Sequence, residues 1–198
     1  MDSPEPLHLY FDYVDPASYL LERQLRKSLC PGDISLVLVP FEIRPPPQPL
    51  LHHQDPDWSR HWQRMLEAAE PMGIDLKRPW IVPWSRKAHE LSLHAKESSC
   101  HEEIHDAIFR AYFESGKDIG RVDVLVEVAR SGGLDAMEAR VVLDVDRFRE
   151  AVEAERAEGL AAGVAGPSTL TWRGRSLRGY PGPRALEEFL ASARDEEP

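Results

Sequence analysis

Leu7-His8-Leu9-Tyr10-Phe11-Asp12-Tyr13-Val14-Asp15-Pro16-Ala17-Ser18 is the stretch that decides the fold. A short apolar and aromatic run that ends abruptly predicts a buried β-strand. Asp is a favoured N-cap and Pro is favoured at the first helical position, so Asp15-Pro16 predicts a helix that ends near Cys30-Pro31-Gly32. A second apolar run, residues 34–41, predicts another strand. A strand-helix-strand unit of this length favours a parallel pair with a right-handed crossover.

The pattern changes after Arg44. The run Pro45-Pro46-Pro47-Gln48-Pro49 cannot propagate a helix or a sheet, and helical signals follow it. Asp55-Pro56 repeats the cap-plus-proline start, and Ser99 with Glu102 and Asp135 with Glu138 have capping-box spacing. These signals predict four or five helices between residues 55 and 162.

The end of the chain returns to strands. Residues 168–172 and 175–178 flank the turn Arg173-Gly174 and predict a β-hairpin, and residues 183–193 predict a last helix. The fold class is therefore α/β, a thioredoxin-like fold with a large α-helical insertion. We expect a discontinuous thioredoxin-like domain over residues 1–44 and 163–198, with the helical insertion over 45–162.

The composition disfavours several classes of function and partner. The formal charge of −10 over 198 residues, with no basic run, disfavours nucleic acid as a partner, because phosphate backbones are held mainly by Lys and Arg. Neither a signal peptide nor an apolar segment near the roughly 20 residues of a membrane span is found, so we expect a cytoplasmic protein without a membrane partner. The two cysteines, Cys30 and Cys100, are too few for a disulfide framework.

Four segments carry a resemblance to a known family. They are residues 11–20, residues 40–45, residues 107–119 and residues 163–169, which read FDYVDPASYL, PFEIRP, AIFRAYFESGKDI and GVAGPST. Together they resemble the DsbA superfamily of thioredoxin-fold proteins over nearly the whole chain. The resemblance is closest to the FrnE-like oxidoreductases, with 2-hydroxychromene-2-carboxylate isomerases and kappa-class glutathione transferases as relatives, and it implies an oxidoreductase or an isomerase.

The resemblance also implies a site at the strand-to-helix turn. The oxidoreductases have Cys-Pro-x-Cys where this chain has Asp15-Pro16-Ala17-Ser18, so dithiol-disulfide exchange is excluded. The glutathione-using relatives have a serine at the position of Asp15, and a carboxylate about 4 Å from a thiolate costs on the order of 4 kcal/mol at an effective dielectric of 20. Asp15 and Ser18 are the candidate catalytic residues, although Asp15 needs no role beyond capping the helix. Asp15→Ser is then expected to change stability little and to improve thiol binding.

A second implied element is a cis-proline loop that faces this turn. Gly166, Pro167 and Ser168 are the candidate cofactor-binding residues, with glutathione as the candidate cofactor, and Gly166-Pro167 is the candidate cis bond. An ungapped match places Ser168 on the proline position, so the cis bond has either moved or been lost. Residues 179–184 lack the acidic residue that receives the glutamyl amine in the glutathione-using relatives.

Two further patterns lie in the helical region. His101-Glu102-Glu103-Ile104-His105 matches H-E-x-x-H, but no third ligand is evident, so we expect no metal site. Trp58 and Trp62 share a helix face and could roof a substrate pocket, although aromatic residues at this spacing usually pack a core. We favour the core.

Two functions remain open from the sequence. One is a thiol- or glutathione-dependent isomerase or transferase, and the alternative is a non-catalytic ligand- or peptide-binding protein on a thioredoxin scaffold. The expected partner is a small molecule, or a thiol or peptide substrate. The sequence also leaves open whether the protein forms a homodimer.

Overall fold

A four-stranded sheet lies at the centre of the computed structural model, which describes residues 5–29 and 34–194. Its strands are β1 (Leu7–Phe11), β2 (Leu36–Pro40), β3 (Thr169–Trp172) and β4 (Arg175–Arg178), in the order β2-β1-β3-β4. β1 pairs with β2 in parallel and with β3 antiparallel, so that Leu9 lies opposite both Leu38 and Leu170. The predicted parallel pair and the predicted hairpin of β3 and β4 are both confirmed.

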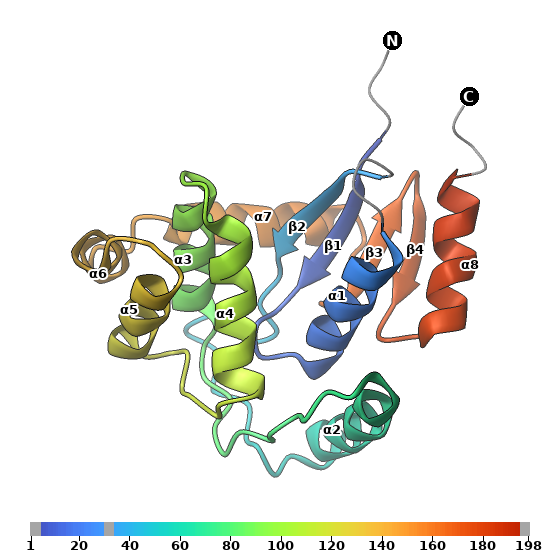
Figure 1. Ribbon diagram of the computed structural model, residues 1–198, viewed down its shortest axis with the longest axis horizontal. Helices are drawn as coiled ribbons and strands as arrows, with labels where there is room; N and C mark the ends of the chain where they lie inside the picture. Colours follow the sequence, from blue (N-terminus) through green and yellow to red (C-terminus); the bar gives the residue numbers. More distant parts are fainter. Residues whose placement is uncertain (1–4, 30–33, 195–198) are drawn as a thin grey trace.

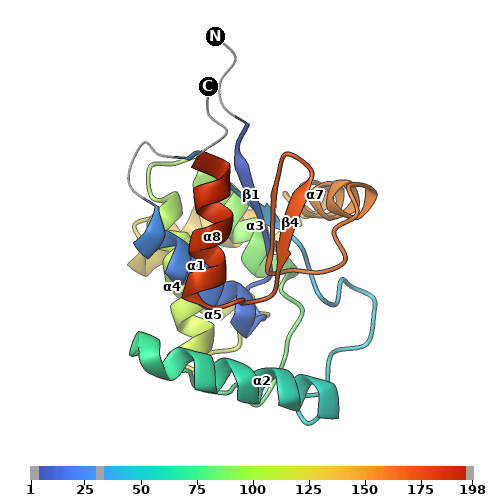
Figure 2. The same cartoon turned by 90° about the vertical axis from the view of Figure 1, so that its right-hand side faces the viewer.

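Helices cover both faces of this sheet. α1 (Pro16–Ser28) and α8 (Pro183–Arg194) lie on one face and α7 (Arg149–Ala161) on the other, as Figure 2 shows with the sheet between them. α7 comes close to β1 at Gly159, where an added Cβ would lie 2.8 Å from the Tyr10 ring. The thioredoxin-like α/β architecture expected from the sequence is therefore present.

The remaining helices lie between β2 and α7 in the chain. They are α2 (Pro56–Ala69), the short 3₁₀ helix η1 (Glu70–Met72), α3 (Arg86–Lys96), α4 (His101–Phe113), α5 (Val122–Ser131) and α6 (Ala136–Asp144). α3 to α6 gather beside the β2 edge of the sheet, whereas α2 lies apart, below the first turn of α1 (Figure 1). No helix in the described ranges is long and apolar enough to cross a membrane.

Helix starts follow the sequence signals in three cases and depart from them in one. Asp15, Asp55 and Asp135 each cap a helix through the side chain, as predicted. The predicted Ser99 cap is wrong, because α4 begins one residue later, after Cys100, and its first turn has no side-chain cap. α1 ends at Ser28, and the predicted stop at Cys30-Pro31-Gly32 lies outside the described residues.

An aromatic core joins the sheet layer to the helices of the insertion. The Phe109 ring lies 5.9 Å from Phe11 on β1, and Phe113 lies 5.1 Å from Tyr19 on α1. Trp62 is 1% exposed and packs 5.7 Å from Phe113, while Trp58 is 7% exposed. The core interpretation of both tryptophans is confirmed, and Trp62 packs α2 against α4.

Candidate functional site

Asp15 forms the centre of the strand-to-helix turn. Its Oδ2 accepts hydrogen bonds from the Ser18 backbone N–H at 2.9 Å and from the Ser18 hydroxyl at 2.8 Å, and its Oδ1 accepts from the Ala17 N–H at 3.3 Å. The Ser18 hydroxyl in turn accepts from the Asp12 backbone N–H at 3.2 Å. Asp15 is 3% exposed. The capping role expected from the sequence is present, but the carboxylate does more than cap.

Ser168 reaches the same carboxylate from the loop before β3. Its hydroxyl donates to Asp15 Oδ2 and lies 3.4 Å from the Ser18 hydroxyl oxygen. The fold therefore brings together three of the five predicted site residues, which come from positions about 150 residues apart in the chain.

The structure decides between the two alternatives that the sequence left open for Gly166-Pro167. In the described ranges the one cis peptide bond is Pro46-Pro47, so the cis bond of this loop has been lost rather than moved to Gly166-Pro167. The loop turns instead at Ser168, whose φ of 54° lies in the left-handed region. The Gly166 carbonyl accepts from the Thr169 hydroxyl at 2.8 Å, which ties the loop to β3.

His61 is the site residue that the sequence did not indicate. It lies on α2 between the two buried tryptophans, and its Nε2 is 2.9 Å from Asp15 Oδ1. Because an ionised carboxylate has no proton to donate, Nε2 carries a hydrogen and donates it to Oδ1 in this contact. A histidine three residues after Trp58 carries no special signal in a sequence, and only the packing of α2 over α1 brings it to the turn.

The charge state of Asp15 follows from these contacts. Burial alone raises the pKa of this carboxyl, but the hydrogen bond and charge of His61 and the hydroxyls of Ser168 and Ser18 outweigh burial and lower the pKa. The site at neutral pH is therefore a buried carboxylate that orients one imidazole.

A cavity of about 530 Å³ opens beside His61. It lies between α2 and the loop that follows β4, and its lining includes Arg64, Glu67, Arg178 and Tyr180. Ser18 and Ser168 are 0% and 3% exposed, whereas the His61 side chain is 24% exposed. His61, rather than either hydroxyl, is therefore the member of this cluster that a ligand in the cavity can reach.

The H-E-x-x-H motif lies at the start of α4, and its second histidine is part of the core. His105 is fully buried with its Nδ1 2.7 Å from the Tyr13 hydroxyl, and burial holds its pKa well below the ordinary value. His101 lies 3.3 Å from the Ser92 hydroxyl. Among the described residues, no three His, Cys, Asp or Glu side chains come together as metal ligands would.

The absence of bound zinc remains a prediction. Because a catalytic zinc site needs three protein ligands and an open position, we expect elemental analysis of the purified protein to find far less than one zinc per chain. A stoichiometric zinc that is lost in His105→Ala, with the fold retained by circular dichroism, would contradict this expectation.

Comparison with known proteins agrees with the fold. The model of the DSBA-like thioredoxin domain matches residues 7–191, so the chain belongs to this family, as its resemblance to the DsbA superfamily implied. The uncharacterized protein YwbO of Bacillus subtilis is 30% identical over 151 residues, which are 71% of this chain and 76% of that protein.

Three solved structures show the same fold. A probable DsbA oxidoreductase from Streptomyces coelicolor has a TM-score of 0.83 at 21% identity, over 98% of this chain and 92% of that one. A 2-hydroxychromene-2-carboxylate isomerase has a TM-score of 0.76 at 16% identity, over 94% of each chain. The cytosolic disulfide reductase DsbM from Pseudomonas aeruginosa with GSH has a TM-score of 0.70 at 20% identity, over 94% of this chain and 98% of that one.

Proposed function

We propose that this protein is a glutathione-dependent isomerase or transferase of the DSBA-like family, closest in kind to the FrnE-like branch but without dithiol chemistry. The observation that carries the proposal is the 2.9 Å contact between Asp15 and His61 at the wall of the cavity between α2 and the loop after β4. Catalysis by the family dithiol needs two neighbouring thiols, and this turn supplies a carboxylate and a hydroxyl in their place.

His61 is the base in this proposal. A thiol that enters the cavity gives its proton to His61 Nδ1, and Asp15 stabilises the imidazolium that forms through the hydrogen bond at Nε2. The resulting thiolate faces a cation rather than the bare Asp15 carboxylate. His61 therefore removes the electrostatic objection to a thiolate at a turn that begins with aspartate.

The rest of the cavity suits the charges of glutathione. The tripeptide has two carboxylates and one ammonium group, and the cavity is lined by two arginines, Arg64 and Arg178, and one acid, Glu67. Glu67 comes from α2, so the acidic residue missing from residues 179–184 has a counterpart in the helical insertion. The fold shared with DsbM, a cytosolic disulfide reductase whose structure is described with GSH, supports this ligand, and we propose a cytoplasmic location as well.

Calorimetric titration with glutathione tests the proposal. We expect binding to the wild-type protein and a loss of about tenfold, or about 1.4 kcal/mol, in Arg64→Gln, because that guanidinium pairs with a ligand carboxylate. Arg60→Gln, one turn earlier on α2, is the matched control and is expected to bind like wild type, because Arg60 pairs with Asp57 and does not line the cavity.

The thiol step has its own readout. The ultraviolet absorbance of bound thiolate is expected in the wild-type protein and absent in His61→Gln. S-methylglutathione, which has the same charges but no thiol proton, is expected to bind both proteins alike. Binding without a thiolate signal in the wild-type protein would favour the alternative, a non-catalytic ligand-binding protein, and no binding at all would remove glutathione from the proposal.

A further inference from the structure

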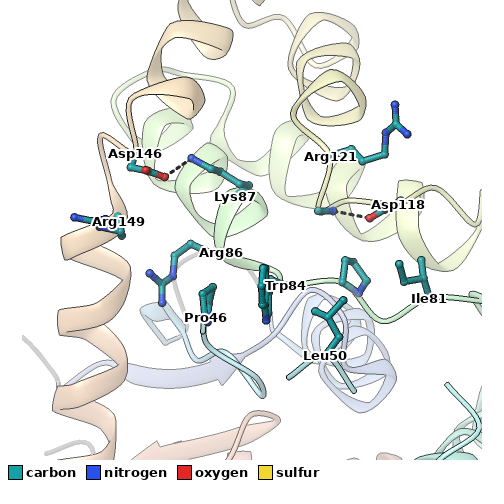
Figure 3. Close-up of a pocket in the computed structure, with 12 residues that line it drawn as sticks. Pro46, Leu50, Ile81, Trp84, Arg86, Lys87, Asp118, Arg121, Asp146 and Arg149 are labelled. Atoms are coloured by element: carbon teal, nitrogen blue, oxygen red, sulfur yellow. Dashed lines mark hydrogen bonds and ion pairs between the residues drawn. The ribbon is translucent and has the colours of Figure 1, made fainter. Parts of the chain in front are cut away.

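A second cavity, of about 410 Å³, lies between the loop after β2 and the N-terminal ends of α3, α5 and α7 (Figure 3). Its lining includes none of Asp15, Ser18, His61 or Ser168. A volume of this size is within the range of small-molecule sites in proteins. It is therefore a candidate site separate from the one at the turn.

The lining of this cavity is divided into an apolar side and a charged side. Figure 3 shows Pro46, Leu50, Ile81 and Trp84 along one side, and Arg86, Lys87, Asp146 and Arg149 along the other. Trp84 is 39% exposed, and its indole N–H donates to the Gln48 carbonyl at 2.9 Å. The indole ring is thus held in place with part of its surface open to a ligand.

The cations on the charged side occupy unusual positions. Arg86 and Lys87 are the first two residues of α3, and Arg149 is the first residue of α7. The N-terminal end of a helix carries partial positive charge, so cations there are unfavourable and anions are favourable. Neither helix has a side-chain cap that would offset this charge.

The protein's own acids compensate two of these cations. Arg86 pairs with Glu42 and Glu153, and Lys87 pairs with Asp146 and Glu90. The backbone N–H of the exposed Arg149 donates to the Asp146 carbonyl, but within the described part of the chain its guanidinium makes no hydrogen bond or ion pair. The pKa of the Asp146 carboxyl is lowered mainly by its hydrogen bond with Lys87, and the nearby charge of Arg149 contributes to this effect. An arginine at an uncapped helix start, in a protein with net charge −10, provides an open position for an anionic group.

We propose that this cavity binds a small organic anion with a planar apolar body, independently of the function proposed for the Asp15 site. The body lies against Trp84 and Leu50, and the anionic group pairs with Arg149 at the start of α7. The apolar side gives most of the buried contact, and the arginine selects an anion over a neutral molecule of the same shape.

A matched pair of probes tests this assignment by calorimetry. 2-Naphthoate and 2-naphthalenemethanol share one planar body, and only the first is charged at neutral pH. We expect the wild-type protein to bind naphthoate at least about fivefold more tightly than the alcohol, and Arg149→Gln to abolish that preference. Trp84→Leu is expected to weaken both probes by about fivefold or more, because each loses its stacking surface.

Two controls distinguish binding in this cavity from binding elsewhere on the protein. Arg184→Gln removes a guanidinium that is 93% exposed on α8 and is expected to change neither affinity. Saturating glutathione is expected to leave naphthoate bound, and displacement would instead assign the anion to the Asp15 site and overturn the proposal. Equal affinity for the two probes in wild type, or naphthoate affinity unchanged in both Arg149→Gln and Trp84→Leu, would also overturn it. Thermal unfolding of each variant confirms that the fold is retained.

Discussion

Asp15→Ala is expected to lower the free energy of unfolding by about 3 kcal/mol, since it removes a helix cap and leaves buried donors without an acceptor. The carboxylate receives the Ser18 N–H and the hydroxyls of Ser18 and Ser168, all of them buried, as well as the His61 ring. A simple surface cap contributes about 1 kcal/mol, so the size of the loss distinguishes a network centre from a cap. Chemical denaturation monitored by circular dichroism measures it.

Asp15→Asn is the conservative comparison. Asparagine can keep one acceptor oxygen toward Ser18, and its NH2 group can donate to His61 Nε2 when the imidazole hydrogen moves to Nδ1, so we expect a loss of only about 1 to 2 kcal/mol. Asp15→Ser, which the sequence suggested would be neutral, has one oxygen where the site uses two, and we expect it to fall between Asn and Ala. A loss below about 1 kcal/mol in Asp15→Ala would show that Asp15 is an ordinary cap.

The stability difference between wild type and Asp15→Asn is expected to depend on pH. The folded-state pKa of Asp15 is lowered, so the ionised carboxylate stabilises the native state above its unfolded pKa of about 3.9. That contribution is lost as the pH falls below about 4 and through the folded pKa, and the two proteins should converge there. Chemical denaturation of both proteins at neutral pH and in this acidic range measures the difference in their free energies of unfolding. A difference that is the same at both pH values would contradict the lowered pKa.

The second large effect is expected at Arg86. Replacing Arg86 with methionine should cost about 3 to 5 kcal/mol, because it leaves the carboxylate of Glu42 buried without its partner. Glu42 is 0% exposed, and its Oε2 lies 2.7 Å from Arg86 Nη2 and 2.9 Å from Nε. Arg86 also pairs with Glu153 at 2.5 Å, so one guanidinium connects the start of α3, the segment after β2, and α7.

The double variant Arg86→Met/Glu42→Leu provides the internal test. It removes both buried charges, so much of the lost stability should return even though the ion pair is gone. Arg130→Met, whose guanidinium is 68% exposed and pairs with Glu127, is the matched surface control and should change stability by less than about 1 kcal/mol. If the double variant is as unstable as Arg86→Met alone, the cost comes from lost packing rather than from a stranded carboxylate.

Local sequence signals were sufficient for the strands, for most helix starts and for the class of fold. They predicted four or five helices between residues 55 and 162, where the structure has six α-helices, α2 to α7. Asp15-Pro16 and Asp55-Pro56 each start a helix because the cap and the fixed proline angle act within a few residues. The apolar runs predicted β1 and β2, and the turn at Arg173-Gly174 predicted the hairpin. Strand burial and turn geometry also depend mainly on residues that are neighbours in the sequence. The turn Asp15-Pro16-Ala17-Ser18, where the resemblance to the DsbA superfamily implies Cys-Pro-x-Cys, is visible in the sequence in the same way, because it needs only four adjacent positions.

The chemistry of the site was decided by contacts between distant segments. Asp15 and Ser18 were predicted from the turn, and Ser168 from a motif, but His61 has no local mark that separates it from the other histidines. Its contact with Asp15 depends on the packing of α2 in the core, where Trp58 and Trp62 are buried and Trp62 lies against Phe113. The cavity at Trp84 and Arg149 likewise exists only because separate helices begin at one place. Caps and strands are set by interactions between near neighbours, whereas a pocket is set by how the packed core places segments that the sequence keeps far apart.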